Sequence, residues 1–125
     1  MNVPKDLKYT PTHEWCKVDG KSVTVGLTDY AQSELGDIVF LQLPGVGTAA
    51  KKGAGLVTIE AVKTVADLFS PLDGKVTAVN GALDSDPQKI NQDCYGDGWI
   101  LKLEVTDPSQ LNGLLDAGSY SETLH

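Results

Sequence analysis

The sequence predicts a mainly β protein, a small sandwich or flattened barrel with short helices at its edges. Short segments rich in β-branched residues recur along the chain and are separated by clusters of turn-forming residues. The composition agrees, because 13 glycines and only 6% aromatic residues suit a protein of short strands and many turns. With 125 residues, the chain is long enough for one hydrophobic core and too short for two, so a single domain over residues 1–125 is expected.

The first expected element is a β-hairpin. Residues 11–18 and 21–26 are both strand-like, and the dipeptide Asp19-Gly20 between them is typical of a tight turn. Each strand would then lie beside the other in antiparallel register.

A short helix and a further strand are expected next. Thr28 can cap a helix over residues 29–35, and Gly36 would end it. Residues 37–43 are apolar on both sides of the strand, which predicts a central strand rather than an edge strand. Residues 44–53, which contain Pro and several Gly, then form a loop.

The most informative stretch is residues 55–69, which is rich in β-branched side chains. It is too long for one ordinary strand, so it should fold back on itself with Lys63 at or next to the tip. The bend has none of the Gly, Asn or Asp residues that usually form tight hairpin turns, which suggests a tip chosen for its side chain. Lys63 either keeps an apolar hairpin soluble or is displayed for modification, as in cofactor-carrier domains.

The remaining elements are shorter. Residues 75–80 form a strand, and residues 81–97, rich in Asp, Asn, Pro and Gly, are expected to wrap the surface. Residues 98–105 form a strong strand with charged side chains alternating outward. Short helices are expected at residues 108–115 and 120–124.

The charge of the chain excludes two classes of partner. Seventeen acidic residues against ten basic ones, all of them Lys, give a net charge of −7. Nucleic acids and anionic membranes need clustered Lys and Arg, so neither is an expected partner. No signal pattern precedes the fold, and no apolar stretch approaches the length needed to span a membrane.

No catalytic constellation is evident. His13 beside Glu14 suggests a base, but His125 at the terminus is the only other His, and packing is an alternative role for His13. Cys16 and Cys94 lack metal-ligand or redox spacing, so two free thiols are expected, with a disulfide as the alternative. A thiol-dependent enzyme remains a further possibility to be tested.

The residues around the lysine resemble one family closely. Residues 60–67 read Glu-Ala-Val-Lys-Thr-Val-Ala-Asp and are followed by Ser70-Pro71 and Gly74, a pattern similar to the lipoyl-lysine segment of glycine cleavage system H proteins. Further matching blocks lie at residues 9–15, 26–32, 36–44, 79–80, 95–100 and 114–117. Biotin carriers flank their lysine with Met, and lipoyl domains of 2-oxo acid dehydrogenases typically read Asp-Lys-Ala, so both fit less well.

The resemblance implies a hybrid barrel-sandwich lipoyl-domain fold with a C-terminal helical extension. It also implies that Lys63 carries lipoic acid in amide linkage and that the chain is a non-catalytic shuttle. The shuttle would take the aminomethyl group from glycine decarboxylase (P protein) to the aminomethyltransferase (T protein), and the reduced dithiol to dihydrolipoamide dehydrogenase (L protein). The alternative is a relay that donates lipoyl groups to 2-oxo acid dehydrogenases.

The resemblance also assigns four further site residues. Glu14 and Asp67 would hold the loaded arm, whereas Glu14 could instead pair with a nearby lysine and Asp67 could be a solvated strand residue. Glu60 and Gly74 match positions that a lipoate ligase or lipoyl transferase reads. Their alternative roles are an outward-facing strand Glu and a turn Gly that needs positive φ.

Two expectations concern the surroundings of the protein. Cys94 stands where the family usually has Pro, and an exposed thiol there would exchange with a dihydrolipoyl group. The chain starts at Met without a transit segment, so a monomer in a bacterial cytoplasm is expected, or in the mitochondrial matrix if the source is eukaryotic.

Overall fold

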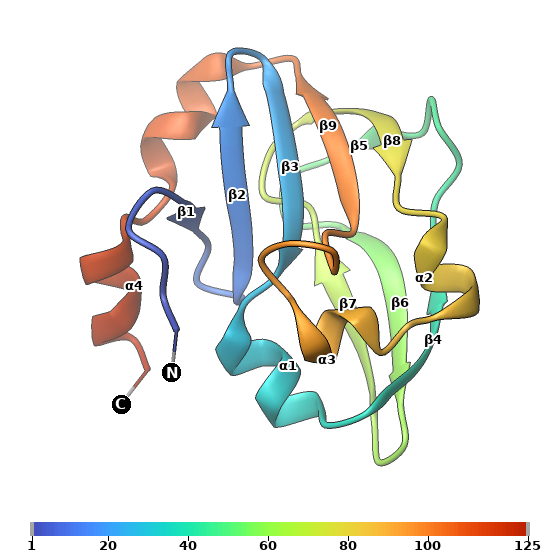
Figure 1. Ribbon diagram of the computed structural model, residues 1–125. Helices are drawn as coiled ribbons and strands as arrows, with labels where there is room; N and C mark the ends of the chain where they lie inside the picture. The colour runs from blue at the N-terminus through green and yellow to red at the C-terminus, as the bar shows by residue number, and fades with distance from the viewer. Residues whose placement is uncertain (1, 125) are drawn as a thin grey trace.

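A computed structural model describes residues 2–124; Met1 and His125, the two ends of the predicted domain, lie outside the described residues. The described chain forms two antiparallel sheets, one with strand order β1-β2-β3-β9-β8-β5 and one with order β4-β6-β7. Figure 1 shows helices α1 and α3 at the end of the sheets from which the β6–β7 hairpin projects. The predicted β fold with short helices at its edges is confirmed.

The strands are short, as expected for a turn-rich protein. Their bounds are β1 Lys8–Tyr9, β2 Glu14–Asp19, β3 Ser22–Leu27, β4 Ile38–Gln42, β5 Ala49–Ala50, β6 Gly55–Ala61, β7 Val65–Phe69, β8 Gly74–Val79 and β9 Leu101–Val105. The helices are α1 Asp29–Leu35, α2 Ala82–Ser85, α3 Lys89–Gln92, the 3₁₀ helix η1 Pro108–Gly113, and α4 Ala117–Glu122.

The first hairpin and helix are largely as predicted. β2 and β3 pair from Glu14 opposite Leu27 to Asp19 opposite Ser22. The Thr28 hydroxyl accepts the backbone N–H of Ala31 and so caps α1.

Strand β2 begins later than predicted, at Glu14 rather than at residue 11. The backbone N–H of His13 donates to the carbonyl of Thr10, and His13 itself has φ of 71°. This left-handed backbone is uncommon for a residue with a side chain, and it closes a turn over residues 10–13. Glu14 is therefore the first residue of β2 and directly follows a tight turn.

The prediction that residues 37–43 form a central strand is wrong. β4 pairs with β6 alone and is the edge of the three-stranded sheet. Ile38 and Leu41 are buried, but Val39 and Phe40 are 49% and 50% exposed. Burial therefore explains the apolar residues on only one side of this strand, and the exposed Val39 and Phe40 remain to be explained.

Residues 81–97 were predicted to wrap the surface, and most of them are exposed or partly exposed, but the segment is more regular than expected. Short helices α2 and α3 form there, and each inserts one fully buried side chain, Leu83 and Ile90, into the core. The loop predicted at residues 44–53 contains strand β5, which pairs with β8. At the C-terminus, α4 begins at Ala117, earlier than predicted, because the Asp116 carboxylate caps it.

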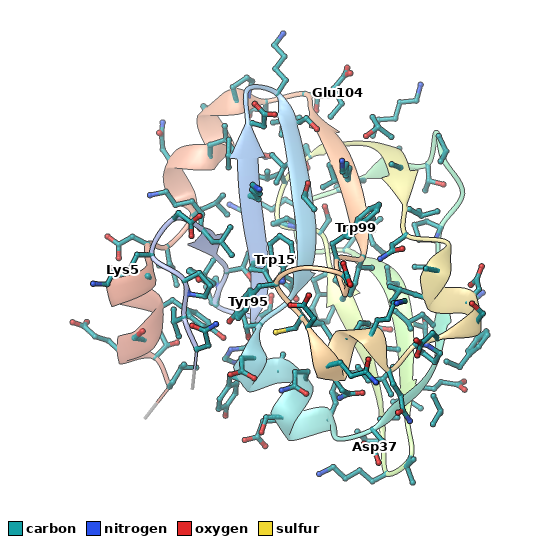
Figure 2. The ribbon with its side chains drawn as sticks, viewed as in Figure 1. Lys5, Trp15, Asp37, Tyr95, Trp99 and Glu104 are labelled. Carbon is teal, nitrogen blue, oxygen red and sulfur yellow. The ribbon has the colours of Figure 1, made fainter. Side chains whose placement is uncertain are left out.

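Two clusters make up the interior. The larger lies between the sheets and includes the inward residues of β9, where Leu101, Leu103 and Val105 are buried and the charged residues between them are exposed, as predicted. The smaller joins the two ends of the chain through Leu7, Tyr9, Trp15 and Tyr120. Figure 2 shows Trp15 close to Tyr95, whose ring lies 6.1 Å away.

Candidate functional site

Lys63 lies at the tip of the β6–β7 hairpin. The tip comprises residues 62–64, between strands that end at Ala61 and begin at Val65, and it projects beyond the sheets (Figure 1). The N–H of Ala61 donates to the carbonyl of Thr64 at 2.8 Å, which closes the turn. Lys63 is exposed, and its amine is therefore accessible to an enzyme.

The tip is attached to the corner between α1 and β4. The backbone N–H of Val62 donates to the carbonyl of Asp37 at 3.0 Å, and Figure 2 shows Asp37 at the tip end of the hairpin. Gly36 has φ of 76°, and a Cβ added there would lie 3.4 Å from Cε of Lys63. The stem of the lysine thus rests over a residue that has no side chain.

Asn91 of α3 fixes this corner, a role that sequence analysis missed. Its Oδ1 accepts the N–H of Ile38 at 3.0 Å, and its Nδ2 donates to the carbonyl of Gly36 at 2.8 Å and to Gln32 Oε1 at 3.1 Å. One amide side chain therefore supports both sides of Asp37. An Asn within a polar segment carries no sequence signal for this role.

Glu14 is a buried carboxylate, only 1% exposed. The hydroxyls of Thr10 and Thr12 donate to its Oε1 at 2.6 and 2.5 Å, and the N–H of Phe69 approaches Oε2 at 3.4 Å. Burial raises the pKa of Glu14, and these hydrogen bonds oppose the rise. Neither threonine was predicted to contact Glu14, because a strand was expected from residue 11 and the turn over residues 10–13 was not.

Glu14 forms no ion pair among the described residues, although Lys52 also lines the pocket next to it. The one ion pair within residues 2–124 joins Lys89 to Asp86 at 3.9 Å, so the alternative that Glu14 pairs with a lysine is wrong. A buried charge is normally paired, because removing it from water is costly. Glu14 is therefore a buried carboxylate that is hydrogen-bonded but lacks an opposite charge at ion-pair distance in this part of the chain.

A pocket of about 410 Å³ lies beside Glu14. Its walls are mostly apolar and include Pro11, Phe69, Pro71 and Leu114. A small apolar group would bury its surface in such a pocket, with the Glu14 carboxylate available to a positive group attached to it.

Asp67 lies near this pocket but not in it. It is exposed on β7, 3.5 Å from the Thr58 hydroxyl, and it lines a smaller cavity of about 190 Å³. Thr12 lines both cavities, so they adjoin. Glu14 and Asp67 thus face neighbouring hollows rather than a single shared one.

Glu60 and Gly74 lie at opposite ends of the hairpin. Glu60 is exposed on β6, opposite Val65, close to the tip. Gly74 follows the far end of β7 and does not have the positive φ that its turn was expected to need. Its requirement is steric, because a Cβ there would lie 2.3 Å from the carbonyl oxygen of Glu104.

The remaining candidate groups are used in packing. His13 Nδ1 is hydrogen-bonded to the Tyr120 hydroxyl at 2.8 Å, and its ring packs against Tyr30. Cys16 and Cys94 are free and buried, and burial raises the pKa of Cys94 to about 12. Cys94 is therefore not the exposed, exchange-competent thiol that was considered, and neither cysteine has the environment of a reactive nucleophile.

Within residues 2–124, no three His, Cys, Asp or Glu side chains are grouped so that they could hold a metal ion. The helices of the same part of the chain are all too short and polar to cross a bilayer.

The family model described as "Glycine cleavage H-protein" matches residues 7–125. The chain belongs to this family. The H-protein family comprises lipoyl carriers of the glycine cleavage system that are not catalytic by themselves, so the chain is a carrier component rather than an enzyme.

Individual H proteins are similar over nearly their whole length. One of Thermus thermophilus is 48% identical over 124 residues, which cover 99% of this chain and 97% of that relative. One of Symbiobacterium thermophilum is 53% identical over 119 residues, 95% of this chain and 93% of that relative. The crystal structure of the H protein from Mycobacterium marinum matches with a TM-score of 0.86 and 38% identity, over 96% of this chain and 97% of that one. This match confirms the barrel-sandwich fold.

Proposed function

We propose that lipoate is attached to Lys63 and that the chain is the shuttle of glycine cleavage. It takes the aminomethyl group from glycine decarboxylase to the aminomethyltransferase and presents the reduced dithiol to dihydrolipoamide dehydrogenase. Family membership and the exposed tip lysine support the attachment. The observation that carries the shuttle function is Glu14, a buried carboxylate that forms no ion pair within the described chain and lines a mostly apolar pocket.

The residues present fit the cofactor. Lys63 offers an accessible primary amine, and the apolar walls of the Glu14 pocket suit a small sulfur-containing ring. When bound, lipoate would supply a disulfide whose S–S bond opens, so that one sulfur takes up the aminomethyl group and the other becomes a thiol. The protein contributes orientation, shielding and charge.

Glu14 and Asp67 have different parts in holding the positive amine of the load. Glu14 binds it out of water, with Thr10 and Thr12 fixing the orientation of the carboxylate. Asp67, exposed at the adjoining cavity, attracts it from the solvent side. An exposed contact contributes roughly 0.2–1 kcal/mol and a buried one more, so the docked arm is favoured by several-fold to about a hundredfold. Such a preference shields the load yet allows its release to the next partner.

The lipoylating enzyme, a lipoate ligase or lipoyl transferase, would read Glu60 near the tip. Gly74 lies beyond the far end of β7, so we propose that it supports recognition indirectly, by allowing β8 and β9 to approach. The bacterial relatives support a bacterial cytoplasm as the compartment, and a monomer is sufficient for the proposed shuttle.

The test is reconstitution with purified decarboxylase, aminomethyltransferase and dihydrolipoamide dehydrogenase. The lipoylated chain should support release of CO2 from glycine, and Lys63→Arg should not. Glu14→Gln should be lipoylated normally but lose its load to water faster, because a neutral amide attracts an ammonium group weakly. Equal lifetimes of the loaded forms would contradict the role of Glu14.

The relay to 2-oxo acid dehydrogenases predicts a different outcome. Deleting the gene in its host should then remove lipoyl groups from those enzymes. Unchanged lipoylation after deletion would eliminate the relay, and the Glu14 pocket is better suited to the shuttle because a relay holds no amine.

A further inference from the structure

Apolar side chains are gathered on the surface around the tip lysine. Val39, Phe40, Val62 and Val65 are 49%, 50%, 74% and 61% exposed. Glu60 lies among them, directly opposite Phe40 on one side and Val65 on the other. Because residues opposite each other in a sheet point to the same face, these three side chains share the outer face of the β4-β6-β7 sheet. We call these five residues the tip surface.

A β-bulge increases the apolar area of the tip surface. Ile38 pairs with Ala61 and Phe40 pairs with Glu60, so Val39 is the extra residue on β4. Without the bulge, Val39 and Phe40 would point to opposite faces of the sheet. With it, both are about half exposed. Bulges often re-aim a side chain next to a functional site, and this one lies beside the tip that carries Lys63.

The fold alone gives no reason for this arrangement. An exposed apolar edge strand promotes association and is normally protected by charged residues or Pro. Here β4 is such an edge, and its apolar residues are what led sequence analysis to expect a central strand. A surface that is apolar without serving the core is consistent with a binding surface.

The position of the tip surface limits its partner. An enzyme that acylates Lys63 must bring its active site to Nζ, so it must contact the residues next to the tip. An enzyme that acts on the sulfur atoms meets the far end of a long flexible arm and need not contact these residues. The charge of Glu60 within an apolar surface calls for a cation within an apolar surface on the partner.

We propose that the tip surface is the docking face for the enzyme that lipoylates Lys63. The proposal rests on Lys63 being the attachment site. The partner would present an apolar patch that covers Phe40 and Val65, with a Lys or Arg positioned to meet Glu60. Recognition would therefore extend to β4, a strand distant from Lys63 in sequence, rather than being confined to the residues flanking the lysine.

The test measures lipoylation of the full-length apoprotein by a purified lipoate ligase with ATP and lipoate. The variants are Phe40→Thr, Val65→Thr and Glu60→Gln, with Val46→Thr as the matched control. Val46 is 66% exposed but lies in the loop between β4 and β5, away from the tip (Figure 1). Thr is favoured in strands, as Phe and Val are, and it has the β-branched shape of Val, so the strands should be preserved.

Phe40→Thr and Val65→Thr should each lower kcat/KM by about tenfold, mainly by raising KM, as expected for residues that contribute to a contact surface. Val46→Thr should match the wild type. Glu60→Gln should reduce the dependence of KM on salt, because the charge pair is lost. In all variants, Lys63 should react at the wild-type rate with a small acylating reagent, N-hydroxysuccinimidyl acetate.

Other outcomes would overturn the proposal. Wild-type kcat/KM in both Phe40→Thr and Val65→Thr, or an equal loss in Val46→Thr, would show that the tip surface is not read. Slower reaction of a variant with the small reagent would mean that the substitution makes Lys63 less accessible, and not that it removes a contact with the ligase. A concentration-dependent dimer disrupted by Phe40→Thr would assign the surface to a second copy. If the wild-type chain is not lipoylated at Lys63, the proposed attachment fails instead, which distinguishes the two failures.

Discussion

Glu14 illustrates how one residue can reduce stability for the sake of binding. Its carboxylate is buried and forms no ion pair with residues 2–124, and only two hydroxyls and one distant N–H partly replace its lost water. Burial therefore raises the pKa of Glu14. A group whose carboxylic acid form is favoured by folding destabilises the folded state when it is ionised. The apoprotein should be less stable at neutral pH than the same fold with a neutral side chain at this position.

Glu14→Gln should accordingly stabilise the apoprotein at pH 7 by about 1 kcal/mol, within the usual range for a stabilising substitution. The amide oxygen can still accept from Thr10 and Thr12. The gain should vanish below the ordinary Glu pKa of 4.5, where Glu14 is protonated in both states. Urea unfolding of both proteins at pH 7 and pH 4 measures the difference. A gain that is the same at both pH values would mean that ionisation of Glu14 is not its cause.

At the scale of elements, the tip lysine depends on a segment far from it in sequence. Asn91 of α3 binds both sides of Asp37, and the carbonyl of Asp37 accepts the N–H of Val62 in the tip. These bonds connect α3 to the tip through Asp37, in addition to the pairing of β4 with β6, so α3 helps to hold the tip in place. The tip thus has a rigid support on one side and solvent on the other.

Asn91→Ala should destabilise the protein by about 1–3 kcal/mol, because the N–H of Ile38 and the carbonyl of Gly36 lose their partner. Hydrogen exchange of the Val62 amide should accelerate more than that of the Val23 amide in the distant β2–β3 hairpin. Uniform acceleration of both amides would instead indicate a global loss of stability without a specific effect on the tip.

Thr28 links helix α1 to helix α4, beyond the capping role that its position predicts. Its hydroxyl accepts from the N–H of Ala31 and is also within 2.7 Å of the Tyr120 hydroxyl. Thr28→Ala should therefore cost more than the ~1 kcal/mol of a lost cap. The matched control is Thr106→Ala, at an exposed Thr outside the helices and strands. If thermal unfolding shows a loss of stability no larger than about 1 kcal/mol, the hydrogen bond between Thr28 and Tyr120 does not contribute to stability.

At the scale of the whole molecule, β1 and α4, which come from opposite ends of the chain, pack against each other next to the turn that precedes Glu14. Tyr9 and Tyr120 stack with ring centroids 4.6 Å apart, and Tyr9 and Leu115 exchange backbone hydrogen bonds. The Tyr120 hydroxyl also binds His13, the residue before Glu14. Packing of the C-terminal helix therefore helps to hold the turn that presents Glu14.

Tyr120→Phe should keep the stacking but lose the hydroxyl, at a cost of about 1–3 kcal/mol, since Thr28 and His13 lose a buried partner. The loosened turn should also weaken retention of the load at Glu14. Denaturant unfolding and the lifetime of the loaded form check the two effects. A stability loss with an unchanged lifetime would separate the C-terminal helix from the site.

The sequence predicted correctly those elements that are determined by residues close together in the chain. The Asp19-Gly20 turn, the Thr28 cap and the long β-branched run around Lys63 each encode their structure within a few residues. The edge position of β4 was not predictable, because it depends on which strands pair rather than on the strand's own residues. Asn91 was missed for the same reason, since its partners become neighbours only after the chain folds. Thr10 was missed because the turn that brings it back to Glu14 was not predicted.

The central claim, that the tip lysine carries the cofactor, is tested most directly by mass spectrometry. The chain is coexpressed with a lipoate ligase, and its intact mass and proteolytic peptides are measured beside those of Lys63→Arg. The account predicts one lipoyl group per chain, located on the peptide that contains Lys63 and absent from the variant. An unmodified wild-type chain, or a lipoyl group on any other lysine, would contradict it.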